Sequence, residues 1–173
     1  MQKNSVFADT MMTGFVNGAV MVSYNLILYV LGFTFNKFAG FVAYPLMIGL
    51  LTWGMFYRRT QLGGYITYGQ SLITGVMISV YGGMIVTLYT VVLFFFIDPQ
   101  LFEQFFKVQE AELLKNPQMT DEMVDQAISM MRKFMSKESF IGISLVSSAI
   151  FGLILSAIIS IFVKKNDPNV IAY

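Results

Sequence analysis

Long apolar blocks divide this chain into four segments, separated by polar stretches of very different length. The blocks lie at about residues 11–32, 38–57, 69–97 and 139–163. About twenty residues of α-helix, at ~1.5 Å per residue, cover the ~30 Å hydrocarbon layer of a bilayer. Each block is long enough for this. The pattern therefore predicts four membrane-spanning helices.

The polar segment between the third and fourth blocks, residues 98–138, holds most of the charge of the chain. It contains eight of the ten acidic residues and five of the eleven basic residues. In its second half, from Met123 to Met135, apolar residues recur at helical spacing and charged residues take the opposite face. The segment predicts two amphipathic helices hinged near Asn116-Pro117. The expected fold is all-α, with four transmembrane helices and an extramembrane helical hairpin.

The apolar stripe of this insert is the candidate surface for a partner. A hairpin of this kind cannot bury its stripe within itself, so the stripe is expected to cap the bundle, lie on the bilayer or bind another protein. Packing of the two helices on each other and on the bundle is the structural alternative. The residues chosen for the candidate surface are Met123, Ile128, Met131 and Phe134.

Small residues spaced by four form ridges on the third and fourth blocks. Such ridges let neighbouring membrane helices approach closely, so helix packing is the first interpretation. A self-association face, or a narrow cleft between the two ridges, is the alternative. The ridges consist of Gly75, Ser79 and Gly83 in the third block and Ser144, Ser148, Gly152, Ser156 and Ser160 in the fourth.

Two arginines, Arg58 and Arg59, directly follow the second block and precede Gly63-Gly64. Guanidinium groups beside exposed backbone amides can hold a phosphate, which makes both arginines candidate contacts for a lipid headgroup. Simple anchoring of the helix end at the membrane surface is the other interpretation.

Four spans place both termini on the same side of the membrane. The terminal side carries five basic residues and the other side six, so the totals do not decide the orientation. Basic pairs that directly follow the second and fourth blocks favour cytoplasmic termini. Residues 98–138 are then expected in the periplasm.

Composition excludes several kinds of chemistry. The chain has 173 residues, 12% of them charged, and it contains no cysteine and no histidine. Disulfides, thiol nucleophiles, imidazole metal ligands and Ser-His triads are therefore absent. No charged residue lies within the four blocks, where an ion-coupled carrier usually needs one. We expect no enzyme, no catalytic residue, no metal and no cofactor, and the net charge of +1 does not favour nucleic acid.

Several segments together resemble a known family. They are a segment from Arg59 to Gln70 that contains GGYITYGQ, a glycine-rich third block, FIDP at Phe96–Pro99, and MRKFM at Met131–Met135. This order is similar to that of the bacterial inner-membrane family called domain of unknown function 4199. The resemblance covers nearly the whole chain and implies a four-span protein of a Gram-negative inner membrane. It implies no catalytic residue, ligand or partner.

The preferred hypothesis is a small accessory or scaffold subunit of an inner-membrane assembly. Its spans would anchor it, and the insert would contact another membrane protein or a second copy of the chain. The alternative is a protein that binds or carries a lipid or amphiphile. That protein would use the two small-residue ridges and a headgroup contact at Arg58 and Arg59.

Overall fold

The structure, a computed structural model, describes residues 6–168 and is almost entirely helical. Its helices are α1 (Val6–Val30), α2 (Lys37–Gln61), α3 (Tyr68–Val92), α4 (Gln100–Leu113), α5 (Asp121–Phe134) and α6 (Lys137–Val163), with a π-helical turn at Leu93–Ile97. The four helices α1, α2, α3 and α6 are long and apolar enough to cross a membrane. The predicted all-α fold with four candidate spans is confirmed.

The helices extend beyond the apolar blocks at several ends. α1 begins before the expected Met11, and α2 continues through both arginines to Gln61. α3 leaves α-helical geometry after Val92, where the wider turn closes with a hydrogen bond from the Asp98 amide to the Leu93 carbonyl at 2.8 Å. Backbone hydrogen bonding continues into polar residues, so hydropathy marks the membrane-embedded part of a helix better than its ends. Lys3, counted above for topology, lies outside the described residues.

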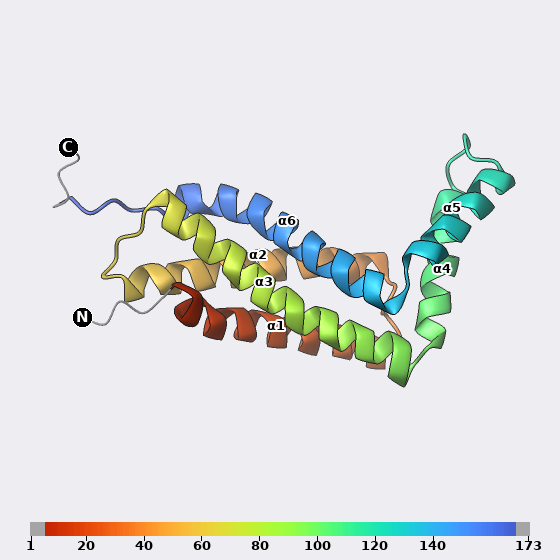
Figure 1. Cartoon of the computed structure of the whole chain (residues 1–173), viewed down its shortest axis with the longest axis horizontal. Helices are drawn as coiled ribbons and strands as arrows, with labels where there is room; N and C mark the ends of the chain where they lie inside the picture. Colours follow the sequence, from red (N-terminus) through yellow and green to blue (C-terminus); the bar gives the residue numbers. More distant parts are fainter. Residues whose placement is uncertain (1–5, 169–173) are drawn as a thin grey trace. The chain divides into compact units, whose positions relative to one another are not determined.

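The chain forms two compact units. The first contains α1 and α2, α3 up to Val86, and α6 from Leu145 onward, and these helices run alongside one another (Figure 1). The second, Thr87–Ser144, contains the last residues of α3, the π-helical turn, α4, α5 and the start of α6.

In the first unit, α3 meets α6 along the two small-residue ridges. A Cβ atom added to Gly75 would lie 2.7 Å from the Ser156 Cβ, and one added to Gly152 would lie 2.7 Å from the Ser79 Oγ. Neither distance leaves room for another carbon atom. The next contact along the ridges pairs Gly83 with Ser148, whose Cβ would lie 2.6 Å from the added atom. The two helices therefore touch through glycine and serine at three successive levels.

The same helix α3 also packs against α1 and α2. A Cβ added to Gly18 of α1 would lie 2.8 Å from the Ile85 Cβ, and one added to Gly54 of α2 would lie 2.8 Å from the Ile78 Cδ1. α1 and α2 are tied together near their shared turn, where the Tyr24 hydroxyl donates a hydrogen bond to the Ala39 carbonyl at 2.6 Å. α3 is thus the helix that the other three share.

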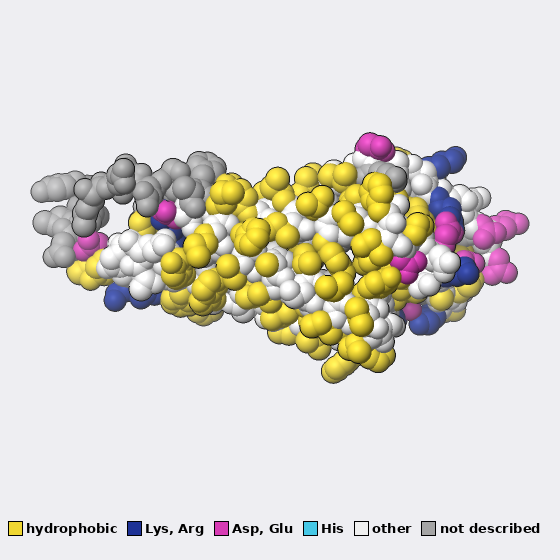
Figure 2. Space-filling view, turned by 90° about the horizontal axis from the view of Figure 1, so that it is seen from below, with side chains coloured by type: hydrophobic (Ala, Val, Ile, Leu, Met, Phe, Trp, Pro, Cys, Tyr) yellow, Lys and Arg dark blue, Asp and Glu magenta, His cyan; other side chains and the backbone are white. Residues whose placement is uncertain are grey.

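Large apolar side chains point outward around this unit. A small core contains Leu51, Met55, Ile66, Ile78, Ile159 and Val163. By contrast, Phe15, Phe41 and Phe162 are 63%, 71% and 76% exposed. Hydrophobic side chains cover the visible face of these helices (Figure 2), and a surface of this kind is expected to face lipid rather than water. The chain has the properties of a multi-pass membrane protein.

Candidate functional site

The second unit has its own helical hairpin, made by α4 and α5. Thr120 begins α5 as an N-cap, because its Oγ1 accepts a hydrogen bond from the Met123 amide at 3.4 Å. Acidic residues occupy the first turn of α5, and Arg132 and Lys133 occupy the last turn, which complements the helix dipole. Local sequence thus defines both ends of α5.

Aromatic side chains form the core of this unit. Phe106 of α4 and Val124 of α5 are each 1% exposed. Phe102 lies between Phe95 and Phe106, with ring centroids 5.0 Å from each. Phe140, at the start of α6, approaches Phe95 edge to face at 6.2 Å. The hairpin is therefore held by contacts among buried and half-buried aromatic rings within its own unit.

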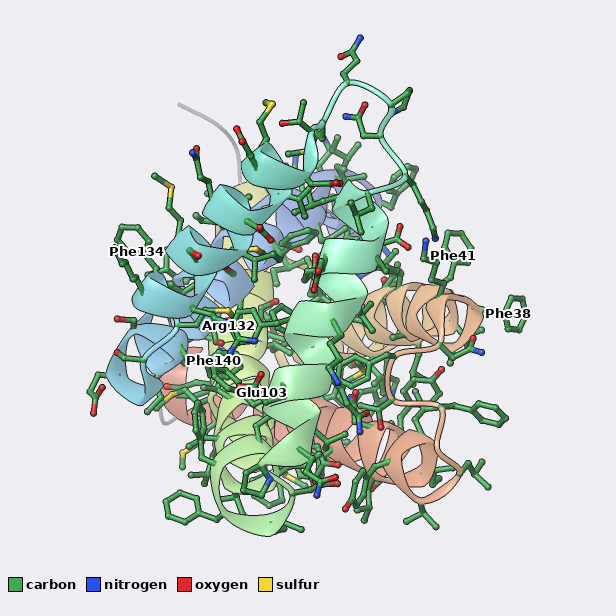
Figure 3. All side chains as sticks on the ribbon, turned by 90° about the vertical axis from the view of Figure 1, so that its right-hand side faces the viewer. Phe38, Phe41, Glu103, Arg132, Phe134 and Phe140 are labelled. Carbon is green, nitrogen blue, oxygen red and sulfur yellow. The ribbon has the colours of Figure 1, made fainter. Side chains whose placement is uncertain are left out.

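A bidentate ion pair joins the two helices of the hairpin. Arg132 of α5 donates to both carboxylate oxygens of Glu103 in α4, at 2.8 and 2.7 Å, and its guanidinium carbon lies 4.4 Å from the centre of the Phe106 ring (Figure 3). The hydrogen bond from Arg132 lowers the pKa of Glu103 below its usual value, and the same bond raises the pKa of Arg132. The side chains of Arg132 and Glu103 remain 44% and 55% exposed, so solvent screens the pair.

Part of the apolar surface of α5 stays uncovered. Met123, Met130 and Phe134 are 49%, 64% and 68% exposed, and their spacing by seven and four residues places them in one row along the helix. We call these three residues the α5 stripe. Phe134 points away from the ion pair at Arg132 (Figure 3).

The expected partner surface therefore divides into an exposed part and a half-buried part. Met123 and Phe134 are exposed, whereas Ile128 and Met131 are half-buried. Met130 is the exposed member that the expected set lacks. Met130 lies seven residues after Met123 and so repeats its position on the helix, but this spacing alone does not show which edge of the apolar face stays exposed.

Arg58, one of the two candidate headgroup contacts, is buried. The residue is 6% exposed, and its Nη1 forms an ion pair with Asp9 of α1. α1 starts early enough to bring Asp9 level with Arg58, and sequence reasoning missed this acidic partner. Replacing one member of a buried ion pair leaves the charge of the other uncompensated, which strongly destabilises the folded protein. Arg58 thus connects α1 to α2 and is not presented to a lipid phosphate.

Arg59 connects three segments of the first unit. Its Nε donates to the Gly64 carbonyl at 3.0 Å and its Nη1 to the Val163 carbonyl at 3.3 Å. Next to it, Ile66 and Lys165 form two backbone hydrogen bonds, each 2.9 Å long. These bonds join the loop after α2 to the chain that follows α6. Arg59 accordingly has a structural role at this end of the bundle.

The two small-residue ridges are in direct contact over Gly75–Ser156, Ser79–Gly152 and Gly83–Ser148. Ser160 is buried, and Ser144 is half-buried within the second unit. A cavity of about 170 Å³ lies beside these contacts, on the side of α1 and α2. The ridge residues Ser79, Gly83, Ser148 and Gly152 form part of the wall of this cavity, whose volume is far too small for a whole lipid.

Acidic side chains are poorly placed for binding a metal. Within residues 6–168, no group of three carboxylates lies close enough to hold an ion. Asp9 and Glu103 are engaged with arginines in the ion pairs described above.

We predict that Glu103→Gln loosens the hairpin at neutral pH and has a smaller effect in acid. The pKa of Glu103 is lowered in the folded protein, so the ion pair contributes stability above the unfolded pKa of about 4.3 and loses it as pH falls through the lower folded value. Amide hydrogen exchange in α4 and α5 should be modestly faster in the variant than in the parent at pH 7, and this difference should be smaller at pH 3. Asp125→Asn, at an exposed position of α5 beyond its first turn, is the control. An equal difference at both pH values would contradict this role for the ion pair.

Comparison with known proteins identifies one family profile that matches the chain. A family profile described as "Protein of unknown function (DUF4199)" matches residues 13–165, which is most of the chain. No curated protein matches the chain, and no solved structure matches it. The match covers α1 from residue 13 onward, the other three apolar helices and the whole hairpin. The chain belongs to the DUF4199 family of proteins of unknown function.

Proposed function

We propose that this protein is an accessory or scaffold subunit of a membrane assembly, in which the hairpin binds another integral membrane protein. The observation that carries this proposal is the α5 stripe. Met130 and Phe134 remain about two-thirds exposed, at 64% and 68%, although α5 packs its opposite apolar edge against α4. Nothing in this role requires a reaction.

The shape and chemistry of the stripe suit a protein contact. Its three residues lie in a row on a helix whose two ends are capped and whose inner face is fixed by Phe106 and Val124. A preorganised helix loses little conformational freedom when it binds. Methionine side chains adapt to irregular apolar surfaces, and an amphipathic helix in a groove is a common mode of recognition.

The charge of the insert favours a protein over the lipid surface. Residues 98–138 carry five basic and eight acidic side chains, a net charge of −3. Helices that lie on anionic membranes are usually rich in lysine and arginine on their polar face. The first turn of α5 has Asp121 and Glu122 instead. We therefore expect an apolar groove on the partner with basic residues at its edge.

The same charge favours a different protein over a second copy of this chain. Two hairpins that each carry net negative charge repel when they meet, and such repulsion selects against self-association. A homo-oligomer remains the outcome that would redirect this proposal, and the measurement below separates the two cases.

The burial of Arg58 is the reason for placing the scaffold role ahead of lipid or amphiphile transport. The transport hypothesis used Arg58 and Arg59 as a headgroup site. Arg58 is paired with Asp9, and Arg59 donates to two backbone carbonyls. The chain therefore lacks the paired free guanidinium groups on which that hypothesis depended.

We further propose that the protein lies in a bacterial inner membrane with cytoplasmic termini and a periplasmic hairpin. Basic pairs follow the second and fourth spans at Arg58-Arg59 and Lys164-Lys165. Such residues beside the ends of spans are characteristic of the cytoplasmic side.

The partner proposal predicts that Met130→Glu abolishes co-purification of a stoichiometric partner. Native membranes are solubilised in mild detergent, and the tagged full-length protein is isolated with whatever it binds. Loss of a central contact in an interface typically costs about 2 kcal/mol or more, so partner recovery should fall by roughly thirtyfold. Gln126→Glu adds the same charge at an exposed polar position of α5 and should leave recovery unchanged.

Light scattering on the same preparation identifies the partner class. A particle that contains one copy of this chain and one different protein is expected. A bare monomer, or equal recovery with both variants, would refute the proposed role of the stripe, and a homo-oligomer would refute the proposal that the partner is a different protein.

The topology proposal predicts opposite labelling of two introduced thiols. The chain has no cysteine, so Gln118→Cys in the hairpin and Gln61→Cys at the end of α2 each supply a unique reactive group. A membrane-impermeant maleimide applied to spheroplasts should label the thiol at position 118 and leave the one at position 61 unmodified until the membrane is permeabilised. Labelling with the reverse pattern would show that the termini are periplasmic.

A further inference from the structure

A cavity of about 170 Å³ lies inside the first unit and is partly open. Side chains from all four helices line it, among them Asn17 and Met21 of α1, Met47 of α2, Ser79 of α3 and Leu155 of α6. No charged residue lines it. The cavity is distinct from the hairpin, because every residue around it belongs to the four-helix unit.

Asn17 is the polar group that distinguishes this cavity from a simple packing defect. The residue is only 7% exposed. Its Oδ1 lies over Gly82, 3.2 Å from where a Cβ of that residue would stand, and both residues line the cavity. The absence of a side chain at Gly82 is thus what gives the amide its space.

Among the described residues, no hydrogen bond to the Asn17 side chain is found. Asn25, two turns along the same helix, behaves differently, because its Nδ2 donates to the Met21 carbonyl at 2.7 Å. Leaving a buried amide without a hydrogen bond costs about 1–3 kcal/mol of folding free energy. A ligand group that forms a hydrogen bond with Asn17 would recover part of this free energy. The Asn17 amide therefore offers a hydrogen-bonding group at the wall of a cavity whose lining is otherwise mainly apolar.

We propose that this cavity binds a small, uncharged, mainly apolar molecule with one hydrogen-bonding group, and that Asn17 contacts that group. The cavity volume limits the size of the ligand, since an engineered apolar cavity of about 150 Å³ accepts one benzene molecule. A charged ligand is excluded because nothing in the lining would compensate its charge. A whole lipid is several times too large. Phenols and short alcohols represent the matching class.

The two lining methionines provide natural reporters for a test. The full-length protein in detergent micelles, with ¹³C-labelled methionine methyl groups, is titrated with phenol and separately with benzene. We expect saturable shifts at Met21 and Met47 and none at Met130, which lies in the hairpin. Phenol should bind about fivefold more tightly than benzene, the factor expected for one net hydrogen bond.

One variant tests whether the probes bind in the cavity, and a second tests whether the Asn17 amide causes the preference for phenol. Leu155→Phe fills the space and should abolish the shifts for both probes. Asn17→Leu should remove the preference for phenol, while Asn25→Leu, whose amide is already paired within α1, should keep it. The comparison of phenol with benzene in the parent protein is valid even if the Asn17 variant fails to fold.

Absence of saturable shifts at Met21 and Met47 would overturn the site, as would equal shifts at Met130. Equal affinity for phenol and benzene in the parent protein would overturn the role of Asn17. None of these outcomes bears on the hairpin, so the result is independent of the scaffold proposal.

Discussion

The close approach of α3 to its neighbours is the contact on which the four-helix unit depends. In lipid, apolar side chains gain little by leaving one apolar environment for another, and helices associate mainly through van der Waals packing. Gly75, Gly83 and Gly152 supply that packing by allowing serine side chains to lie directly against backbone. The Ser156 hydroxyl is buried without a hydrogen bond to the described residues, so packing rather than polar bonding holds this seam.

This mode of assembly explains where the large apolar residues lie. Because small residues occupy the contacts, large residues such as Phe41 and Phe162 remain on the outside of the unit. Charged groups are then restricted to the ends, where Asp9 pairs with Arg58 and Arg59 joins α2 to the chain after α6. The hairpin stabilises itself through its own aromatic core. Neither unit uses the α5 stripe in its interior, which leaves the stripe available to a partner.

Sequence reasoning predicted the helices well because each has a strong local signal. The four apolar blocks and the stripe of α5 could be located from periodicity, and the family resemblance was confirmed. The pairings between helices follow simple geometry once the turns are known. Asp9 and Arg58 lie equally far from the turn at Phe33, and Glu103 and Arg132 lie equally far from the turn near Pro117. The sequence contains both pairs, although hydropathy does not reveal them.

Other features could not be read from the sequence. The exposure of Met130 depends on which edge of α5 faces α4, and periodicity gives a broad apolar face without choosing that edge. The cavity beside Asn17 depends on how four helices meet, which no single segment encodes. Arg58 was a candidate for a phosphate contact because it lies shortly before Gly63-Gly64, and nothing in the local sequence indicates its pairing with Asp9. In each case the missing information was a tertiary contact.

The most direct measurement of the central claim compares the stability of two glycine variants in detergent. Gly152→Leu places a side chain where Ser79 of α3 already lies, whereas Gly49→Leu of α2 adds one where no atom lies within 4 Å. If small-residue packing on α3 holds the unit together, the first variant lowers the free energy of unfolding by about 1–3 kcal/mol relative to the second. Equal stability of the two variants would contradict the account.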